Sequence, residues 1–214
     1  VECVPTYNTD PSLVVGLIAG GYGALVQSVE GAEDDAEAGR AELLALGLTA
    51  DDSVVGIAAS GRTPYVLGAL AAANELGALT VGVSCNLPAA VLDAAQIAIG
   101  VPVGAEVITG STRMKAGTAQ KLVLNMLSTA TMIRLGKVYG NLMVDMRPTN
   151  EKLIDRARRI IAQIAGVEYD EAARLLDASG DLKTAIVMAR RGVSADQARV
   201  LLDTAQGRLR DVID

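Results

Sequence analysis

Histidine is absent from this 214-residue sequence, and aromatic residues are scarce: tyrosine occurs five times, tryptophan and phenylalanine not at all. Without histidine there is no Ser-His-Asp triad, and the most common zinc ligand and general base are missing. Any proton transfer must therefore fall to carboxylate, lysine, tyrosine or cysteine side chains. Because aromatic rings are so few, stacking platforms for nucleic-acid bases are nearly absent and the core must be aliphatic.

Cysteine and net positive charge are lacking as well. Cys3 and Cys85 lie far apart without metal-ligand spacing, which predicts free thiols and neither a metal site nor a redox centre. A formal net charge of −6 disfavours nucleic acid as a partner. Residues 11–29 carry no charge, but Gly20, Gly21 and polar side chains interrupt them, so no membrane span is predicted. We expect a soluble, cytoplasmic protein.

A strand, a tight loop and a helix are predicted in the middle of the chain. The apolar run Val54–Ala58 stops at Ser60 and Gly61, and the alanine-rich segment Tyr65–Leu76 follows. The amides of such a loop, with the hydroxyls of Ser60 and Thr63, would hold an anion of phosphate size. A helix cap formed by the same hydroxyls explains the pattern equally well, and both interpretations stay open.

Further segments complete an α/β pattern around this stretch. We expect buried strands at Leu13–Ala19, Leu79–Cys85 and Ile97–Val101, with a helix beginning in Ala24–Val29. An acidic cluster, Glu30–Asp35, is expected to open a helix that runs to about Leu46. In one helix, Glu30, Glu33, Asp34 and Glu37 would crowd one face, although such residues also simply complement a helix dipole. Alternating strands and helices predict a doubly wound parallel sheet.

The longest helical pattern, Met114–Leu135, is apolar on most faces, so we expect it to be buried within the domain or between subunits. Four polar residues precede or open it where a strand gives way to a helix, the usual ligand position in α/β sheets. These are Glu106, Ser111, Thr112 and Lys115. Loop and capping roles explain them about as well.

The final third of the chain changes character to charged, amphipathic helices. They are expected at Asn150–Ala165, Tyr169–Ala178, Leu182–Arg191 and Ala195–Leu209, while Val1–Ser12 is expected to be a loop. We therefore predict an α/β domain over residues 1–148 and a helical subdomain over residues 149–214. Lys183 is either a solvated surface lysine or a cation that reaches an anionic group when the subdomain closes over the site.

Four stretches of the sequence resemble the N-acetylmuramic acid 6-phosphate etherase family, which has a sugar-isomerase (SIS) type fold. They are residues 29–34, 56–65, 104–121 and 140–145, and the resemblance extends over essentially the whole chain. Family members continue N-terminally with helices, a first sheet strand and a Gly-Thr-Ser-Gly-Arg phosphate loop. The resemblance therefore implies an SIS-type sheet whose first strand is missing from this sequence.

The resemblance also implies an activity. The family cleaves the D-lactyl ether of N-acetylmuramic acid 6-phosphate by C2 proton abstraction, elimination and water addition, without a cofactor and as a homodimer. The family's acid matches Glu2 and its base matches Glu33. Two carboxylates fit a protein that has no histidine. The loop Ser60, Gly61, Arg62 and Thr63 matches the SIS phosphate ligands.

Two other classes of function share this fold. A sugar-phosphate isomerase would use the same phosphate loop and C2 proton abstraction but would release no lactate. A non-catalytic regulator similar to the glucokinase regulatory protein would need Ser60 and Thr63 but neither carboxylate. The presence of both Glu2 and Glu33 favours the etherase.

Overall fold

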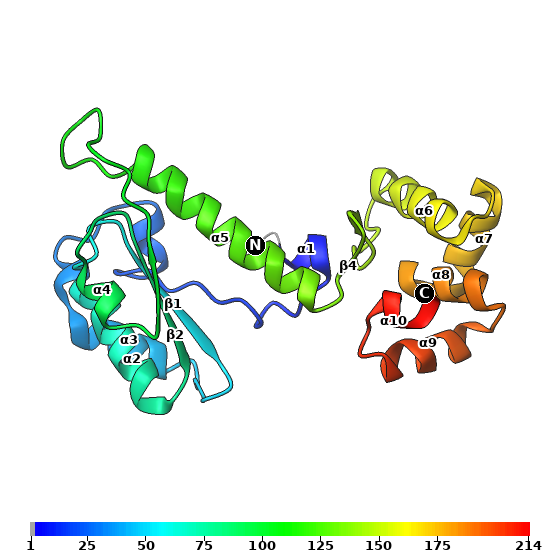
Figure 1. The fold of residues 1–214 in the computed structure, drawn as a ribbon, viewed down its shortest axis with the longest axis horizontal. Helices are drawn as coiled ribbons and strands as arrows, with labels where there is room; N and C mark the ends of the chain where they lie inside the picture. Colours follow the sequence, from blue (N-terminus) through cyan, green and yellow to red (C-terminus); the bar gives the residue numbers. More distant parts are fainter. Residues whose placement is uncertain (1–2) are drawn as a thin grey trace. The chain divides into compact units, whose positions relative to one another are not determined.

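The computed structural model describes residues 3–214 and divides into two compact units (Figure 1). The sheet unit comprises residues 16–126. The helical unit comprises residues 127–214 together with the described residues up to Val15. The predicted division at residue 148 stays a proposal.

A three-stranded parallel sheet forms the centre of the sheet unit, in the order β1 (Ser53–Ala58), β2 (Leu79–Ser84), β3 (Ile97–Gly100). All three strands were predicted within a residue or two. Gly56 of β1 pairs with Gly82 of β2, and a Cβ at either position would collide with a helix on the same face. At Gly56 the collision is with Leu70 of α3 (Pro64–Leu76), and at Gly82 with the backbone of Val91 in α4 (Ala90–Asp93). These glycines allow two helices to pack closely on one face of the sheet.

Helix α2 (Ala36–Leu44) packs against α3 through two glycines. A Cβ built at Gly39 would lie 2.0 Å from the carbonyl oxygen of Tyr65, and one at Gly68 would lie 1.9 Å from that of Ala36. Leu43 of α2 is buried in the small apolar core that the two helices share. The backbones therefore approach so closely that no side chain fits between them at these two positions.

Two predictions between Leu13 and Val29 were wrong. Leu13–Ala19 forms no strand, and Leu13, Val14 and Val15 are more than half exposed. A strand needs a hydrogen-bonded neighbour, and among the described residues β1 pairs only with β2. The helix expected in Ala24–Val29 is a single 3₁₀ turn, η1 (Tyr22–Leu25).

The acidic cluster does not form one continuous helix either. Glu33 and Asp34 lie in a 3₁₀ turn, η2 (Ala32–Asp34), and Asp35 then takes an extended conformation. The Asp35 carboxylate accepts a hydrogen bond from the amide of Ala38 at 2.9 Å and so begins α2. Because an N-cap interrupts the segment, its carboxylates do not share one helix face.

The helical unit contains α1 (Cys3–Tyr7), the hairpin β4 (Val138–Tyr139) and β5 (Leu142–Met143), and the helices coloured yellow to red in Figure 1. Those helices are α6 (Glu151–Ala165), α7 (Tyr169–Ser179), α8 (Leu182–Arg191), α9 (Ala195–Thr204) and α10 (Leu209–Ile213). Helix α8 supplies the centre of their core, with Ala185, Ile186 and Val187 fully buried. Helix α5 (Lys115–Arg134) runs from the sheet unit into this unit.

The amphipathic patterns predicted these helices well, and the misses have local causes. The helix expected to reach Leu209 ends at Thr204, because Gln206 and Gly207 adopt positive φ angles of 54° and 73° before α10 begins. Cys3–Tyr7 is a short helix where a loop was expected, and the β4–β5 hairpin was not predicted. No helix among the described residues is long and apolar enough to cross a membrane.

Replacing Gly39 by alanine tests the close packing of α2 on α3. The added methyl group would overlap the Tyr65 carbonyl, so we expect Gly39→Ala to destabilise the protein by about 1–3 kcal/mol, measured by chemical denaturation. The matched control is Gly117→Ala in α5, where the nearest atom to an added Cβ is 3.8 Å away. That variant should be as stable as the parent or slightly more so. Equal losses from both would contradict the packing argument.

Candidate active site

A cavity of about 610 Å³ opens beside the carboxyl end of β1 within the sheet unit. Its polar wall is made by residues from four separate segments, and Leu17, Ile18, Val29, Ile57 and Val66 are among its apolar lining. The polar residues are Ser28, Glu33, Ser60, Thr63, Tyr65, Thr112 and Gln120. The carboxyl ends of parallel strands are where open α/β sheets bind ligands. The cavity is therefore the candidate active site.

The loop after β1 is folded over the end of β2. Gly61 has a φ of 72°, and a Cβ there would lie 2.3 Å from that of Ala89 and 2.7 Å from the Ser84 hydroxyl. The Gly61 carbonyl accepts a hydrogen bond from the amide of Val91 at 3.0 Å. Only glycine fits this position, and it fixes where the neighbouring Ser60 and Thr63 lie.

The hydroxyls of Ser60 and Thr63 do not cap α3. Thr63 occupies the N-cap position but makes no side-chain hydrogen bond to the helix. Ser60 accepts a hydrogen bond from the amide of Arg62 at 3.3 Å, inside the loop. The capping interpretation is therefore wrong for these residues, and both hydroxyls remain on the cavity wall as donors.

Glu33 lines the same cavity from η2. It is exposed, and no hydrogen bond or ion pair joins its carboxylate to another residue in the described part of the chain. The preceding Gly31, with a φ of 75°, allows the turn that leads into η2. A carboxylate without a protein partner is available to take a proton from a bound molecule.

Tyr65 is the second titratable group on the wall, and it is buried. Its hydroxyl donates a hydrogen bond to Glu42 Oε2 at 2.5 Å. Burial and this hydrogen bond raise the pKa of Tyr65 to about 12. Tyr65 therefore stays protonated near neutral pH, and Glu33 is the other titratable side chain that lines the cavity.

Glu106 holds the beginning of α5. One carboxylate oxygen accepts from the amide of Ala116 and the other from that of Lys115, both at 3.0 Å. These hydrogen bonds lower the pKa of Glu106 below its ordinary value. The Lys115 amine donates to the carbonyl of Ala105 at 2.7 Å.

The cavity thus brings together Glu33, Ser60, Thr63 and Thr112 from the predicted set. The lining does not include the other predicted residues of these loops, which are Gly61, Arg62, Glu106 and Ser111, nor Lys115 at the start of α5. Glu2, the predicted acid, lies outside the described residues.

Lys183 is buried in the helical unit, so the prediction of a solvated surface lysine was wrong. Its amine donates to Asp145 Oδ2 at 2.9 Å and to the Gly207 carbonyl at 2.7 Å. Lys137 forms an ion pair with the same Asp145 oxygen, also at 2.9 Å. These contacts tie α8 to the segment after β5 and to the turn before α10.

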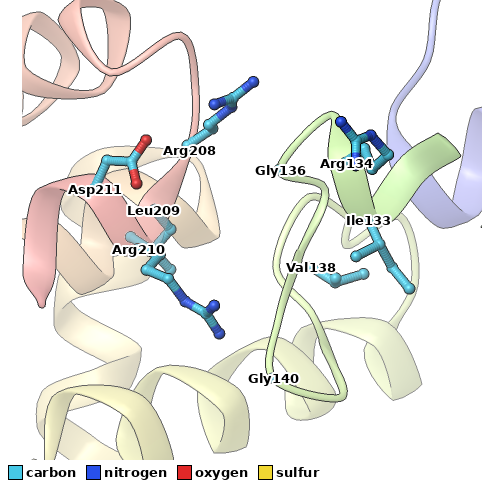
Figure 2. A pocket seen from close by; sticks show the side chains of 9 residues that line it. All are labelled: Ile133, Arg134, Gly136, Val138, Gly140, Arg208, Leu209, Arg210 and Asp211. Atoms are coloured by element: carbon cyan, nitrogen blue, oxygen red, sulfur yellow. The ribbon is translucent and has the colours of Figure 1, made fainter. Parts of the chain in front are cut away.

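A second hollow, of about 340 Å³, lies inside the helical unit (Figure 2). Figure 2 shows Arg208, Arg210 and Asp211 on one side, and Arg134 with the hairpin residues on the other. It contains none of the predicted site residues. No group of three or more histidine, cysteine or acidic side chains able to hold a metal ion occurs among residues 3–214.

Comparison with known proteins shows which families this chain resembles. Residues 3–74 match the family described as glucokinase regulatory protein N-terminal SIS domain. The chain is 59% identical over 210 residues to N-acetylmuramic acid 6-phosphate etherase of Streptomyces avermitilis, covering 98% of this chain and 68% of that protein. It is 56% identical over 214 residues to the etherase of Mycolicibacterium smegmatis, covering all of this chain and 72% of the relative.

The chain belongs to the N-acetylmuramic acid 6-phosphate etherase family. It is accordingly a carbon–oxygen lyase with an SIS-type fold, as the resemblance implied. The parallel sheet flanked by helices agrees with that fold. The sequence did not predict three polar residues that line the candidate active site: Ser28, Tyr65 and Gln120. Ser28 directly precedes the family stretch 29–34, while Tyr65 and Gln120 lie within the stretches 56–65 and 104–121, so a position in or beside a motif was the available signal.

Asp145 offers a test of the buried ion pair. Asp145→Asn would leave the Lys183 ammonium buried without a counter-charge, and we expect a loss of about 3 kcal/mol in the free energy of unfolding. Lys137→Ala is the matched control, because it removes the more exposed partner and leaves the Asp145–Lys183 pair intact; its cost should be under about 1 kcal/mol. If Asp145→Asn lowered the free energy of unfolding no more than Lys137→Ala does, Lys183 would need no counter-charge.

Proposed function

We propose that this chain cleaves the D-lactyl ether of N-acetylmuramic acid 6-phosphate to give N-acetylglucosamine 6-phosphate and D-lactate. The observation that carries the proposal is that the unpartnered Glu33 carboxylate lines one cavity with the hydroxyls of Ser60 and Thr63. A base and phosphate-binding donors are the two elements that such a reaction requires within reach of one sugar phosphate. The names of the relatives supply the substrate.

In the proposed mechanism the open-chain sugar places its C2 proton, acidified by the C1 aldehyde, beside Glu33. Glu33 takes this proton, the C3–oxygen bond breaks, and Glu2 protonates the departing oxygen of D-lactate. Water then adds across the C2–C3 double bond: its hydroxyl goes to C3 while Glu2 takes the proton that water gives up, and Glu33 returns a proton to C2, which restores both carboxyl groups to their starting states. These steps transfer protons and water without a change of oxidation state, so the proposal includes no cofactor.

Substrate binding is proposed to divide among the loops. Ser60, Gly61, Arg62 and Thr63 would take the phosphate through amide and hydroxyl donors. Ser111 and Thr112 belong to the loop before α5, Lys115 begins that helix, and Lys183 completes the proposed set. For Lys183, contact with substrate would require that its amine exchange the Asp145 or Gly207 partner for the ligand.

A regulatory sugar-phosphate-binding role is the second candidate, because residues 3–74 match a glucokinase regulatory protein domain. That match contains Glu33, Ser60 and Thr63 but covers a third of the chain. Binding of N-acetylglucosamine 6-phosphate without release of lactate would favour this role. Exchange of C2 hydrogen with solvent, again without lactate, would favour an isomerase.

Substitution of Glu33 tests the proposed base. Glu33→Gln keeps the shape of the side chain but cannot accept the C2 proton, so D-lactate release and C2 hydrogen exchange should both fall by at least about a hundredfold. Glu2→Gln should block lactate release yet leave exchange measurable, because a leaving-group acid is not needed for the first proton transfer. For both variants, lactate release is measured by a coupled D-lactate assay and C2 hydrogen exchange by deuterium uptake at C2. The Mycolicibacterium smegmatis relative serves as positive control, and unchanged exchange in Glu33→Gln would refute the assignment.

We also propose that the chain is a cytoplasmic homodimer that associates through α5. Leu122, Met126 and Ile133 of this helix are at least half exposed, although its pattern is that of a buried helix. Met126→Glu should therefore shift the protein from dimer to monomer in sedimentation velocity runs. A parent that sediments as a monomer at high concentration would contradict the proposal.

A further inference from the structure

The loop between β3 and α5 is closed by its own two ends. Glu106 near its start accepts two amide hydrogen bonds from Lys115 and Ala116 at its end, and the Lys115 amine reaches back to Ala105. Inside the loop, the amide of Ser111 donates to Ile108 at 3.0 Å. The closure therefore depends on one carboxylate and one lysine.

Apolar packing does not hold this loop. Val107 is 87% exposed, Ile108 67% and Met114 59%. Beyond the loop, α5 is anchored to β2, because the buried Cys85 thiol donates to the Ala116 carbonyl at 3.6 Å. Glu106 thus connects a loop that lacks an apolar anchor to a helix start that has a buried contact.

The same loop carries one wall of the cavity. Gly110 and Thr112 are the residues through which it lines the cavity, together with Ser60 and Thr63 from the loop after β1. Both Glu106 oxygens are occupied by amides, and its side chain is not part of the lining. Its influence on a bound molecule would therefore pass through the backbone of the loop.

We propose that Glu106 is a positioning residue: it holds the loop 107–114 closed so that Gly110 and Thr112 form the cavity wall against which the sugar phosphate binds. The inference rests on the proposed function for the identity of that ligand. It revises the expectation that Glu106 itself contacts substrate. A preformed wall lowers the ordering cost of binding and leaves the proton transfers at Glu33 unchanged.

The test compares Glu106→Gln with Glu106→Ala. Glutamine keeps one acceptor oxygen but presents an NH₂ donor to the second amide, whereas alanine removes both acceptors. For D-lactate release we expect the KM to rise about threefold in Glu106→Gln and about tenfold in Glu106→Ala, with kcat within about twofold of the parent. Such a graded KM effect with preserved kcat separates positioning from catalysis and from general unfolding.

A second measurement does not depend on activity. Hydrogen exchange of peptides covering residues 105–117, followed by mass spectrometry, should be faster in Glu106→Ala than in the parent. The matched control is Asp52→Asn: Asp52 also closes a turn, accepting from the Thr49 amide at 2.8 Å and hydroxyl at 2.9 Å, but it lies before β1, at the opposite strand end from the cavity. It should leave both exchange at residues 105–117 and the KM unchanged.

The outcomes separate this inference from the proposed function. Unchanged exchange in Glu106→Ala would overturn the inference, and so would faster exchange with an unchanged KM, which would make Glu106 merely structural. A parent that releases no D-lactate would overturn the proposed function instead. The dissociation constant for N-acetylglucosamine 6-phosphate then replaces the KM, and the inference stands only if Glu106→Ala weakens that binding.

Discussion

The parallel pairing of β1 with β2 is the constraint on which the cavity depends. Pairing in register from Ser53 and Leu79 to Ala58 and Ser84 brings both strands to an end at the same level. The loop after β1 can then fold over the end of β2, where Gly61 rests against Ser84 and Ala89. A shift of β1 by one residue would turn Gly56 away from α3 and place a side chain against that helix. The positions of Ser60 and Thr63 are therefore consequences of strand register.

The packing of α2 on α3 determines where Glu33 lies relative to Ser60 and Thr63. Glu33 lies three residues before α2, and Thr63 immediately precedes α3, so the distance between the Glu33 carboxylate and the loop hydroxyls follows from how these helices pack. Gly39 and Gly68 bring the two backbones into direct contact, and the Tyr65–Glu42 hydrogen bond joins the helices beside that contact. The α2–α3 contact is thus a backbone feature with a consequence for the cavity, because it brings an unpartnered carboxylate to the cavity that Ser60 and Thr63 also line.

Periodicity predicted the elements whose stability is local or whose partners are present. The strands at Ser53–Ala58 and Leu79–Ser84, α3, and the amphipathic helices α6 to α8 were all found close to their expected bounds. The run Leu13–Ala19 has equal β propensity but pairs with no described strand, and a propensity scale cannot reveal whether a partner exists. The acidic segment failed for another reason: Asp35 competes for α2's amides and begins the helix there instead of continuing it. In the site, motif matches identified Ser60, Thr63 and Glu33. Tyr65 and Gln120 lie in the same matching stretches, but their contact with the cavity depends on how α3 and α5 pack, which no spacing encodes.

Three acidic residues show why residue type alone does not define a role. Glu33, Glu106 and Asp145 each lie in a stretch that resembles the family. From the sequence alone, their three carboxylates cannot be told apart. In the structure Asp145 is shared by two lysines, Glu106 is saturated by two amides, and Glu33 has no partner among the described residues. A carboxylate whose oxygens already accept strong hydrogen bonds is a poorer base, because protonation would cost those bonds. The free carboxylate on the cavity wall is therefore the one to which we assign proton abstraction in the proposed mechanism, while the other two hold in place the segments around them.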